Sequence, residues 1–343
     1  MQNFWINKKV LITGHSGFKG MWLAVILNIF GAKVYGLSDF SVKSKIYEKI
    51  NGKKYFEKEF KVDISKDIKT LKKIFNQNEF DVIFHFAAQA LVYEAQINPL
   101  KTLETNIIGT FNIISEIQNS ECTDSLIVAS TDKVYKFTDQ YNDEKASLGG
   151  NEFYSASKVS AENIIDAFVN TNKTSSLKIS TVRSGNVLGG GDGAKGRLLT
   201  DIVDAAKKGE KIYLRNPIAI RPWQDVLDSL SGYLKVAEFN FINKNVGQFN
   251  LNSDLNSKLT VGEIVNLVLE IWESKIEIVE NSEEHFFETN FLRLNSSKAR
   301  DVLGWKETVE IEEMITKIVN WEKADSESAV EKVTISQINK YFQ

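Results

Sequence analysis

The sequence predicts an α/β protein, with a doubly wound parallel sheet followed by a smaller C-terminal α/β lobe. Three observations lead to this fold class. Short strands alternate with helix-like stretches through the first half of the 343-residue chain, the strands are apolar almost throughout, and a glycine-rich turn joins the first strand to the first helix. Continuously apolar strands are typical of a parallel sheet, because helices cover both of its faces.

The expected elements follow one another in a regular order. Strands are expected at residues 9–13, 33–37, 60–62, 82–86, 126–129 and 179–182, and helices at 20–30, 66–76, 99–118 and 155–170. Beyond residue 186 the pattern is irregular, with helices expected at 198–208, 227–239, 261–272 and 311–322. We therefore expect a first domain over 1–186, a second lobe over 187–323 whose interleaving with the sheet stays open, and a loose polar tail over 324–343.

Composition narrows the class of protein. Hydrophobic residues make up 43% of the chain, charged residues 25%, and the net charge is −3, so we expect neither nucleic-acid nor membrane binding. The single cysteine, Cys122, is expected to be a buried thiol in a reducing compartment. No signal peptide and no long uncharged apolar run are evident, so we expect a cytoplasmic location. His15, His85 and His285 are far apart in the sequence, and we expect no metal site.

The glycine-rich turn has the pattern G-x-x-G-x-x-G. Glycines between a strand and a helix allow a tight turn, and the N–H groups at the start of the helix attract a pyrophosphate. A plain strand–helix turn would show the same spacing, but the alternation downstream favours a Rossmann-type dinucleotide site. The residues expected to contact the cofactor here are Gly14, Ser16, Gly17, Phe18, Lys19 and Gly20.

Further candidate residues lie where other strands are expected to end. Doubly wound sheets bind ligands at the carboxyl ends of their strands. Asp39 follows the second strand and could accept hydrogen bonds from an adenosine ribose, which would favour NAD over NADP, although an ordinary loop aspartate is an equal alternative. Asp63 and Ile64 are expected near the adenine, and small residues follow the fourth strand where the cofactor would pass, at Ala87, Ala88 and Gln89.

Tyr154 and Lys158 are four residues apart in an expected helix, so both side chains lie on one face of it. An ammonium group near a phenol stabilises the phenolate, and we expect Lys158 to lower the pKa of Tyr154. A phenol tuned in this way could take a hydroxyl proton during hydride transfer.

Together these motifs resemble the extended short-chain dehydrogenases/reductases, and within that family most closely the CDP-glucose 4,6-dehydratases. The resemblance covers residues 4–321. The matching segments are residues 13–20, 86–89, 130–133, 154–158, 183–192, 215–217, 220–224 and 303–305. The glycine run that begins at Gly189 and the Arg-Pro-Trp-Gln segment that begins at Arg221 are the most specific of them.

The resemblance implies a role for each catalytic candidate. Tyr154 would remove the sugar O4 proton while the C4 hydride passes to NAD, and Lys158 would hold the nicotinamide ribose. Thr131 would hydrogen-bond O4, and Asp132 would protonate the departing C6 hydroxyl. Lys133 stands where related dTDP-sugar dehydratases carry the glutamate that removes the C5 proton. The residues expected to contact the substrate are Asn186, Arg197, Arg215, Arg221 and Arg293. The arginines are candidates for the substrate pyrophosphate, because guanidinium groups bind phosphate oxygens bidentately, and Asn186 could contact the sugar or its phosphates.

The implied reaction converts CDP-D-glucose to CDP-4-dehydro-6-deoxy-D-glucose and water, with NAD as cofactor, for deoxysugar and surface polysaccharide synthesis. A homodimer or homotetramer is implied, formed through the expected helices at residues 100–118 and 155–170. Two alternatives stay open: an epimerase or reductase of the same fold, and a non-catalytic NAD-binding regulatory protein. The chain departs from the dehydratase pattern at Phe153, Gly193, Gly196, Asp225, Asp228 and Asn295.

Overall fold

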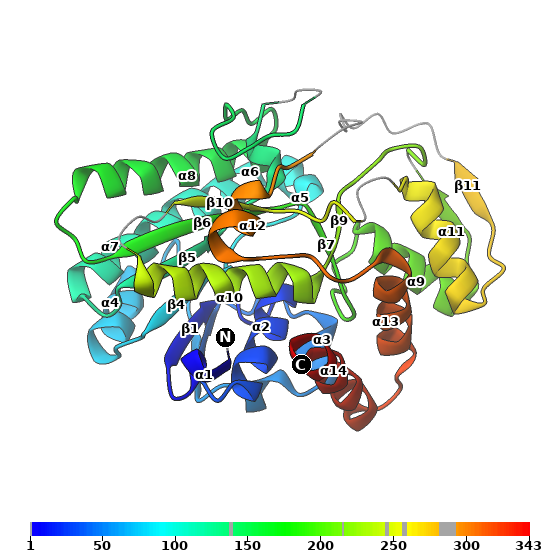
Figure 1. The fold of residues 1–343 in the computed structure, drawn as a ribbon, viewed down its shortest axis with the longest axis horizontal. Helices are drawn as coiled ribbons and strands as arrows, with labels where there is room; N and C mark the ends of the chain where they lie inside the picture. Colours follow the sequence, from blue (N-terminus) through cyan, green and yellow to red (C-terminus); the bar gives the residue numbers. More distant parts are fainter. Residues whose placement is uncertain (1, 137–139, 215, 244–246, 256–258, 281–292) are drawn as a thin grey trace.

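A seven-stranded parallel sheet forms the centre of the protein, which confirms the predicted fold class. The computed structural model describes residues 2–136, 140–214, 216–243, 247–255, 259–280 and 293–343 (Figure 1). The strand order is β10-β6-β5-β4-β1-β2-β3. The strands are β1 (Lys9–Thr13), β2 (Lys33–Ser38), β3 (Lys58–Lys61), β4 (Val82–His85), β5 (Ser125–Ala129), β6 (Lys178–Ser184) and β10 (Gln248–Leu251). All six strands predicted for the first half are therefore present.

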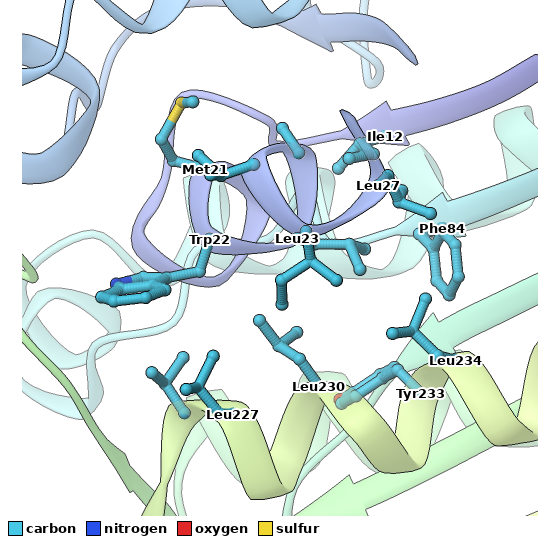
Figure 2. Close-up of a cluster of buried hydrophobic side chains, with 14 of the residues drawn as sticks. Ile12, Met21, Trp22, Leu23, Leu27, Phe84, Leu227, Leu230, Tyr233 and Leu234 are labelled. Carbon is cyan, nitrogen blue, oxygen red and sulfur yellow. The ribbon is translucent and has the colours of Figure 1, made fainter. Parts of the chain in front are cut away.

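Helices cover both faces of this sheet and bury two separate apolar cores. One core lies between the sheet and α2 (Phe18–Ile29) and α10 (Val226–Ile242). Figure 2 shows Leu23 of α2 directed toward Leu230 of α10, with Phe84 of β4 beside them. The other core lies on the opposite face, under α4 (Ile68–Gln77), α7 (Gly109–Ser120) and α8 (Phe153–Thr171). Helices on both faces explain why the strands are apolar throughout.

The helix expected at residues 99–118 is interrupted. It comprises α6 (Pro99–Leu103), a π-helical turn η2 (Glu104–Ile108) and α7. The remaining short elements of this half are α1 (Gln2–Trp5), α3 (Lys45–Lys49), η1 (Gly52–Tyr55), α5 (Val92–Ile97) and η3 (Asp132–Val134).

The second half of the chain forms a smaller lobe and also returns to the main sheet. The lobe holds two short sheets, β7 (Asn186–Leu188) with β9 (Trp223–Asp225) and β8 (Ile212–Leu214) with β11 (Ile278–Glu280). Its helices are α9 (Leu198–Lys208), α11 (Val261–Trp272) and α13 (Ile311–Lys323), which share an apolar core (Figure 1). Because β10 pairs with β6 and α12 (Ser297–Leu303) contacts the same core as α10, the lobe is interleaved with the sheet.

The C-terminal segment is not a loose tail, and this expectation was wrong. Residues 327–342 form α14 (Glu327–Phe342), which buries Val330, Thr334 and Ile338. The Trp321 indole donates to Thr334 Oγ1 at 2.9 Å, so α14 is also tied to α13. Apolar or small side chains every fourth residue give one buried stripe on an otherwise polar helix. No helix in the described part of the chain is long and apolar enough to span a bilayer.

Candidate active site

The glycine turn brings the ends of β1 and β4 into close contact. Gly14 has a φ of +70°, and a Cβ there would lie 2.7 Å from the backbone nitrogen of Ala87. A Cβ on Gly20 would lie 2.5 Å from the Gly14 carbonyl oxygen. Both positions therefore require glycine, one for its left-handed backbone and both for lack of space.

This turn also exposes the start of α2 to a ligand. Gly17 caps α2 without a side-chain hydrogen bond, and Met21 is the first residue whose N–H bonds back into the helix, to the Gly17 carbonyl. The N–H groups of Phe18, Lys19 and Gly20 precede it. Free amides at a helix N-terminus, reached over glycines, fit a pyrophosphate, so this part of the site is suited to a dinucleotide.

Two of the expected cofactor residues have side chains that hold loops. Ser16 is buried, and its hydroxyl donates to the Val42 carbonyl at 2.7 Å and lies 3.0 Å from Ser38 Oγ. Asp39 is exposed at the end of β2 and accepts hydrogen bonds from the backbone and hydroxyl of Ser41 at 2.9 and 2.8 Å. The ribose contact of Asp39 stays a prediction, whereas the Ser16 side chain organises the turn.

Asp63 and Ile64 follow β3. The Asp63 carboxylate accepts from the Ser65 backbone and hydroxyl at 2.9 and 2.6 Å, and buried Ile64 packs against Gly109 of α7. The Ile64 carbonyl accepts from the Asn112 amide at 2.9 Å. These contacts fix the loop, and an adenine contact for these two residues stays a prediction.

Asn106 is a residue of this region that the sequence analysis missed. It lies in the π-helical turn, where its amide oxygen accepts from the Gln89 backbone N–H at 2.8 Å. Its amide nitrogen donates to the Gln89 carbonyl at 2.9 Å and to Ser157 Oγ at 2.9 Å. Asn106 therefore fastens the segment of Ala87, Ala88 and Gln89 to α8. A buried asparagine in an apolar helix was the signal that could have revealed it.

Tyr154 and Lys158 lie in the first two turns of α8, on the face predicted from their spacing. The Glu152 carboxylate caps this helix and accepts from the backbone N–H groups of Tyr154 and Ser155, both at 2.7 Å. Lys158 Nζ donates to the Ala129 carbonyl at 2.8 Å, so the ammonium lies against the end of β5.

The pKa values of this pair differ from the expectation. Burial raises the pKa of Tyr154 to about 12, while the hydrogen bond with Thr131 and the charge of Arg197 lower it, and Asp132 and Glu152 raise it. Because burial of the phenol outweighs the favourable contacts, the pKa of Tyr154 lies above its usual value, and a lowering effect of Lys158 itself stays a prediction. Burial lowers the pKa of Lys158 to about 8, although the Glu162 carboxylate acts in the opposite direction.

Thr131, Asp132 and Lys133 follow β5 directly and begin the short η3 helix. Thr131 Oγ1 donates to Asp132 Oδ1 at 3.0 Å and accepts from the Lys133 backbone N–H at 3.3 Å. Thr131 and Asp132 are buried, and Lys133 is half-buried. Because Thr131 is also hydrogen-bonded to Tyr154, the structure brings the end of β5 and the start of α8 together in one site.

The second lobe reaches this site in two places. A Cβ on Gly185 would lie 2.6 Å from Pro222 and 3.3 Å from Asp132 Oδ2, so the Arg-Pro-Trp-Gln segment passes beside Asp132. Arg197 forms an ion pair with Asp192 at 2.8 Å.

Lys19 of the first domain interacts electrostatically with charged groups of the second lobe. Burial lowers the pKa of Lys19 to about 7, the charges of Lys158 and Arg197 lower it further, and Asp192 raises it. Lys19 Nζ also donates to the Tyr233 hydroxyl at 3.3 Å. Arg197 therefore belongs to the same group of charges as Lys158 and Tyr154, which suits a residue that binds phosphate near the reacting sugar.

The other expected substrate residues are less closely tied to this group. Asn186 begins β7 and is half-buried. Arg221 is buried and donates to the Ile220 carbonyl at 3.1 Å. The Arg293 guanidinium lies over the Tyr141 ring at 5.2 Å and donates to its hydroxyl at 3.4 Å. Arg215 lies outside the described residues.

Two of the departures from the dehydratase pattern have structural roles. Asp225 caps α10 by accepting from the Leu227 N–H at 2.7 Å. Asp228 is fully buried and accepts from the backbone N–H groups of Thr308 and Val309 at 2.9 and 3.2 Å, and from the Tyr341 hydroxyl at 2.8 Å. Asp225 therefore fixes the start of α10, and Asp228 holds the C-terminal helices in place.

His85 and Cys122 are buried, as expected. His85 lies between Thr13 Oγ1 at 2.7 Å and Thr110 Oγ1 at 3.1 Å. Burial lowers the pKa of His85 to about 3, with a smaller contribution from Lys158, so the imidazole is neutral near pH 7. Among the described residues, no group of three or more His, Cys, Asp or Glu side chains could hold a metal ion.

Known proteins with similar sequences and structures agree with the resemblance seen in the sequence. A family model described as GDP-mannose 4,6 dehydratase matches residues 11–318. CDP-glucose 4,6-dehydratase of Salmonella typhimurium is 33% identical over 335 residues, covering 94% of this chain and 92% of that protein. The structure of UDP-glucose 4-epimerase of Thermotoga maritima with UDP-glucose has a TM-score of 0.81 and 22% identity, covering 91% of this chain and 97% of that one. UDP-glucose-4-epimerase from Stenotrophomonas maltophila, with bound NAD and formylated UDP-arabinopyranose, has a TM-score of 0.83 and 20% identity, covering 93% and 98%. At these identities the solved structures support the fold alone.

Proposed function

Because the chain belongs to the GDP-mannose 4,6-dehydratase family of extended short-chain dehydrogenases/reductases, we propose that it is an NAD-dependent nucleotide-sugar 4,6-dehydratase. The proposed reaction converts CDP-D-glucose to CDP-4-dehydro-6-deoxy-D-glucose and water, as the name of the Salmonella relative suggests. Such a product would serve deoxysugar and surface polysaccharide synthesis.

One observation carries this proposal: a second acid–base pair adjoins the Tyr154–Lys158 pair. Thr131 and Asp132 are buried at the end of β5, and Thr131 is hydrogen-bonded to Tyr154. Exchange of a proton at O4 needs Tyr154 alone. Loss of water across C5 and C6 needs an additional acid and base, and Asp132 and Lys133 are available for these roles.

NAD is the proposed cofactor, and the residues at the sheet edge fit it. Gly14 and Gly20 allow the tight turn that leads to the start of α2, where the pyrophosphate would bind, and Asp39 offers a carboxylate after β2 that would repel a 2′-phosphate. NAD would supply the hydride acceptor at C4 and the hydride donor at C6, so the reaction would need no net reductant.

The protein's own groups would move the protons. Tyr154 would take the O4 proton, and Asp132 would donate a proton to the departing C6 oxygen. A C4 ketone acidifies the C5–H bond, and Lys133 could remove this proton in its neutral form or stabilise the enolate in its charged form. Arg197 and Arg221 would bind the substrate pyrophosphate, with Asn186, Arg215 and Arg293 as further contacts.

A panel of CDP-, dTDP-, UDP- and GDP-sugars tests this function. The expected product has lost one water and develops the alkali-induced absorbance of a 4-keto-6-deoxy sugar. The selected sugar is then deuterated at C4. Deuterium recovered at C6 supports a dehydratase, deuterium retained at C4 with one stereocentre changed means an epimerase, and no turnover of any sugar favours a regulatory NAD-binding protein.

We also propose a homodimer or homotetramer. Apolar side chains are exposed on the adjacent elements α6, η2, α7 and α8, where they would pack against a second copy. They are Leu100, Ile108, Phe111 and Phe153.

A further inference from the structure

A buried ion pair lies behind the catalytic pair. Glu162 of α8 and Arg183 of β6 are each about 2% exposed. Arg183 Nε donates to both Glu162 oxygens, at 3.1 and 3.0 Å, and its Nη2 donates to Glu162 Oε2. Arg183 Nη1 donates to the Tyr135 hydroxyl at 2.6 Å, which in turn donates to Asn250 Oδ1 at 2.7 Å. The Glu162 carboxylate is therefore held in place by Arg183, whose guanidinium is itself hydrogen-bonded to Tyr135.

The same carboxylate is bonded to the strand that carries the site. Ser130 Oγ donates to Glu162 Oε1, and Ser130 stands directly before Thr131 and Asp132. Lys158 lies one helical turn before Glu162, on the same face of α8, and its Nζ donates to the carbonyl of Ala129, the residue before Ser130. Glu162 is thus fixed beside Lys158 by bonds to two different strands.

We propose that Glu162 is a positioning residue that keeps the buried Lys158 in its ammonium form, the form that the proposed reaction requires. A buried ammonium is costly unless an opposite charge lies near it. The opposing effects on the pKa of Lys158, lowered by burial and raised by Glu162, agree with this role.

The other charges around these two groups do not replace Glu162. Lys158 is also within electrostatic range of Lys19 of α2 and of neutral His85 of β4. Lys19, whose pKa is lowered to about 7, offers no negative charge that could stabilise the ammonium form of Lys158. Around Glu162 the charged neighbours are Arg183 and Asp166, and Asp166 lies two turns beyond Lys158 on α8.

The test measures the titration of Lys158 directly, so it does not depend on turnover. The protein is labelled with [6-¹³C]lysine, the ε-carbon signal of Lys158 is assigned through Lys158→Arg, and its shift is followed against pH. The wild-type midpoint is expected at about 8, and Glu162→Gln should move it down by about one pH unit. A Glu162→Gln midpoint equal to that of the wild type overturns the inference.

Two further variants keep the test decisive. Glu162→Gln combined with Arg183→Met removes the Arg183 charge that the single variant leaves unpaired, in case that variant fails to fold, and it should also move the Lys158 midpoint downward. Asp166→Asn removes a carboxylate from the same helix and should leave the Lys158 midpoint in place. An equal shift in Asp166→Asn would mean that Glu162 has no special role.

The inference rests on the proposed function in one respect, namely that the reaction requires the ammonium form of Lys158. The pH–rate profile with the sugar selected by the panel should therefore stop rising at a lower pH in Glu162→Gln, by the same displacement. If Glu162→Gln shifts the titration of Lys158 but leaves the pH–rate profile unchanged, the reaction does not require the Lys158 ammonium, and the catalytic part of the inference is refuted. If the wild type turns over no sugar, the proposed function fails, while the titration still decides whether Glu162 controls Lys158.

Discussion

The hydrogen bond between Thr131 and Tyr154 offers a sensitive test of the proposed base. Burial raises the pKa of Tyr154 to about 12, and the Thr131 hydroxyl is the largest influence that lowers it. At pH 8 a phenol with this pKa is ionised in about one molecule in ten thousand. The rate of C4 oxidation should therefore rise about tenfold per pH unit over the neutral range, because the base is active only as the phenolate.

Thr131→Val removes the hydroxyl and preserves the shape of the side chain. A hydrogen bond to a charged group contributes about 1.5–3 kcal/mol, and one pKa unit corresponds to about 1.4 kcal/mol. The pKa of Tyr154 should thus rise by about one to two units in the variant, and the oxidation rate at pH 7.5 should fall about 10- to 100-fold.

The assay is single-turnover formation of reduced nicotinamide, followed at 340 nm between pH 6.5 and 9.5. It isolates the first step, which matters because the Thr131 hydroxyl is also within hydrogen-bonding distance of Asp132, at 3.0 Å. Thr131→Ser keeps the hydroxyl and should stay close to wild type, while Tyr154→Phe should lose about 10²- to 10⁴-fold and the pH dependence with it. A folded Thr131→Val enzyme within threefold of wild type, or one whose rate ignores pH, would refute this assignment of the base.

Three further predictions concern stability and assembly. Ile338→Ala, in the core of α14, should lower the free energy of unfolding in urea by about 2–5 kcal/mol, while exposed Ser328→Ala on the same helix should change it by less than about 0.5 kcal/mol; equal effects would mean that α14 does not pack as described. Burial raises the pKa of Asp225 from 3.8 to about 6, so the protonated carboxyl favours the fold at low pH and this contribution is lost as pH rises through about 6. The free energy of unfolding of Asp225→Asn should therefore gain about 2 kcal/mol relative to that of the wild type between pH 4 and 8. A difference between the two proteins that stays constant with pH in urea unfolding would contradict this. Leu100→Glu on the exposed α6 face should give a monomer by light scattering, whereas Ile218→Glu in the second lobe should leave the oligomer intact, and an unchanged mass for both would exclude the proposed interface.

The order of strands and helices could be predicted because each strand is buried on both faces. Such a strand is apolar at every position, and its ends are marked by polar or glycine residues. α14 was missed because its fully buried residues are Val330, Thr334 and Ile338, and three small or apolar residues spaced through a polar segment are a weak signal. The π-helical turn around Asn106 could not be predicted, since it depends on the contacts of the asparagine amide with a distant loop.

Local geometry predicted part of the catalytic group, and the resemblance to the dehydratases supplied Thr131 and Asp132. The spacing of Tyr154 and Lys158 fixes a common helix face, and Thr131 and Asp132 follow a strand whose end must lie at the ligand-binding edge. The proximity of Lys19 to Arg197 could not be foreseen, because it joins segments 178 positions apart through tertiary packing. The direction in which the pKa of Tyr154 shifts could not be predicted either, since the spacing of two residues contains no information on how deeply the phenol is buried.

The glycine run that begins at Gly189 shows why a branch-specific motif need not report the substrate. A Cβ on Gly190 would lie 2.3 Å from the Trp321 ring, so α13 packs directly on the run. The Trp22 indole donates to the Gly190 carbonyl at 3.0 Å, and Glu322 accepts from the Gly191 N–H at 3.1 Å. These residues join α2 of the first domain to α13 of the second lobe through the run.

Asp192 follows the run immediately and forms the ion pair with Arg197 beside Lys19. The glycines therefore act on the site indirectly, by fixing where Asp192 and its partner lie. Asp228 also acts indirectly, since it accepts hydrogen bonds from the Thr308 backbone, just before α13, and from the Tyr341 hydroxyl of α14. A change at Asp228 thus alters how the C-terminal helices are fastened rather than which sugar is bound. The departures at Asp225 and Asp228 are consequently compatible with the same substrate class, and substrate choice must be tested at residues that reach Asp132, such as those around Pro222.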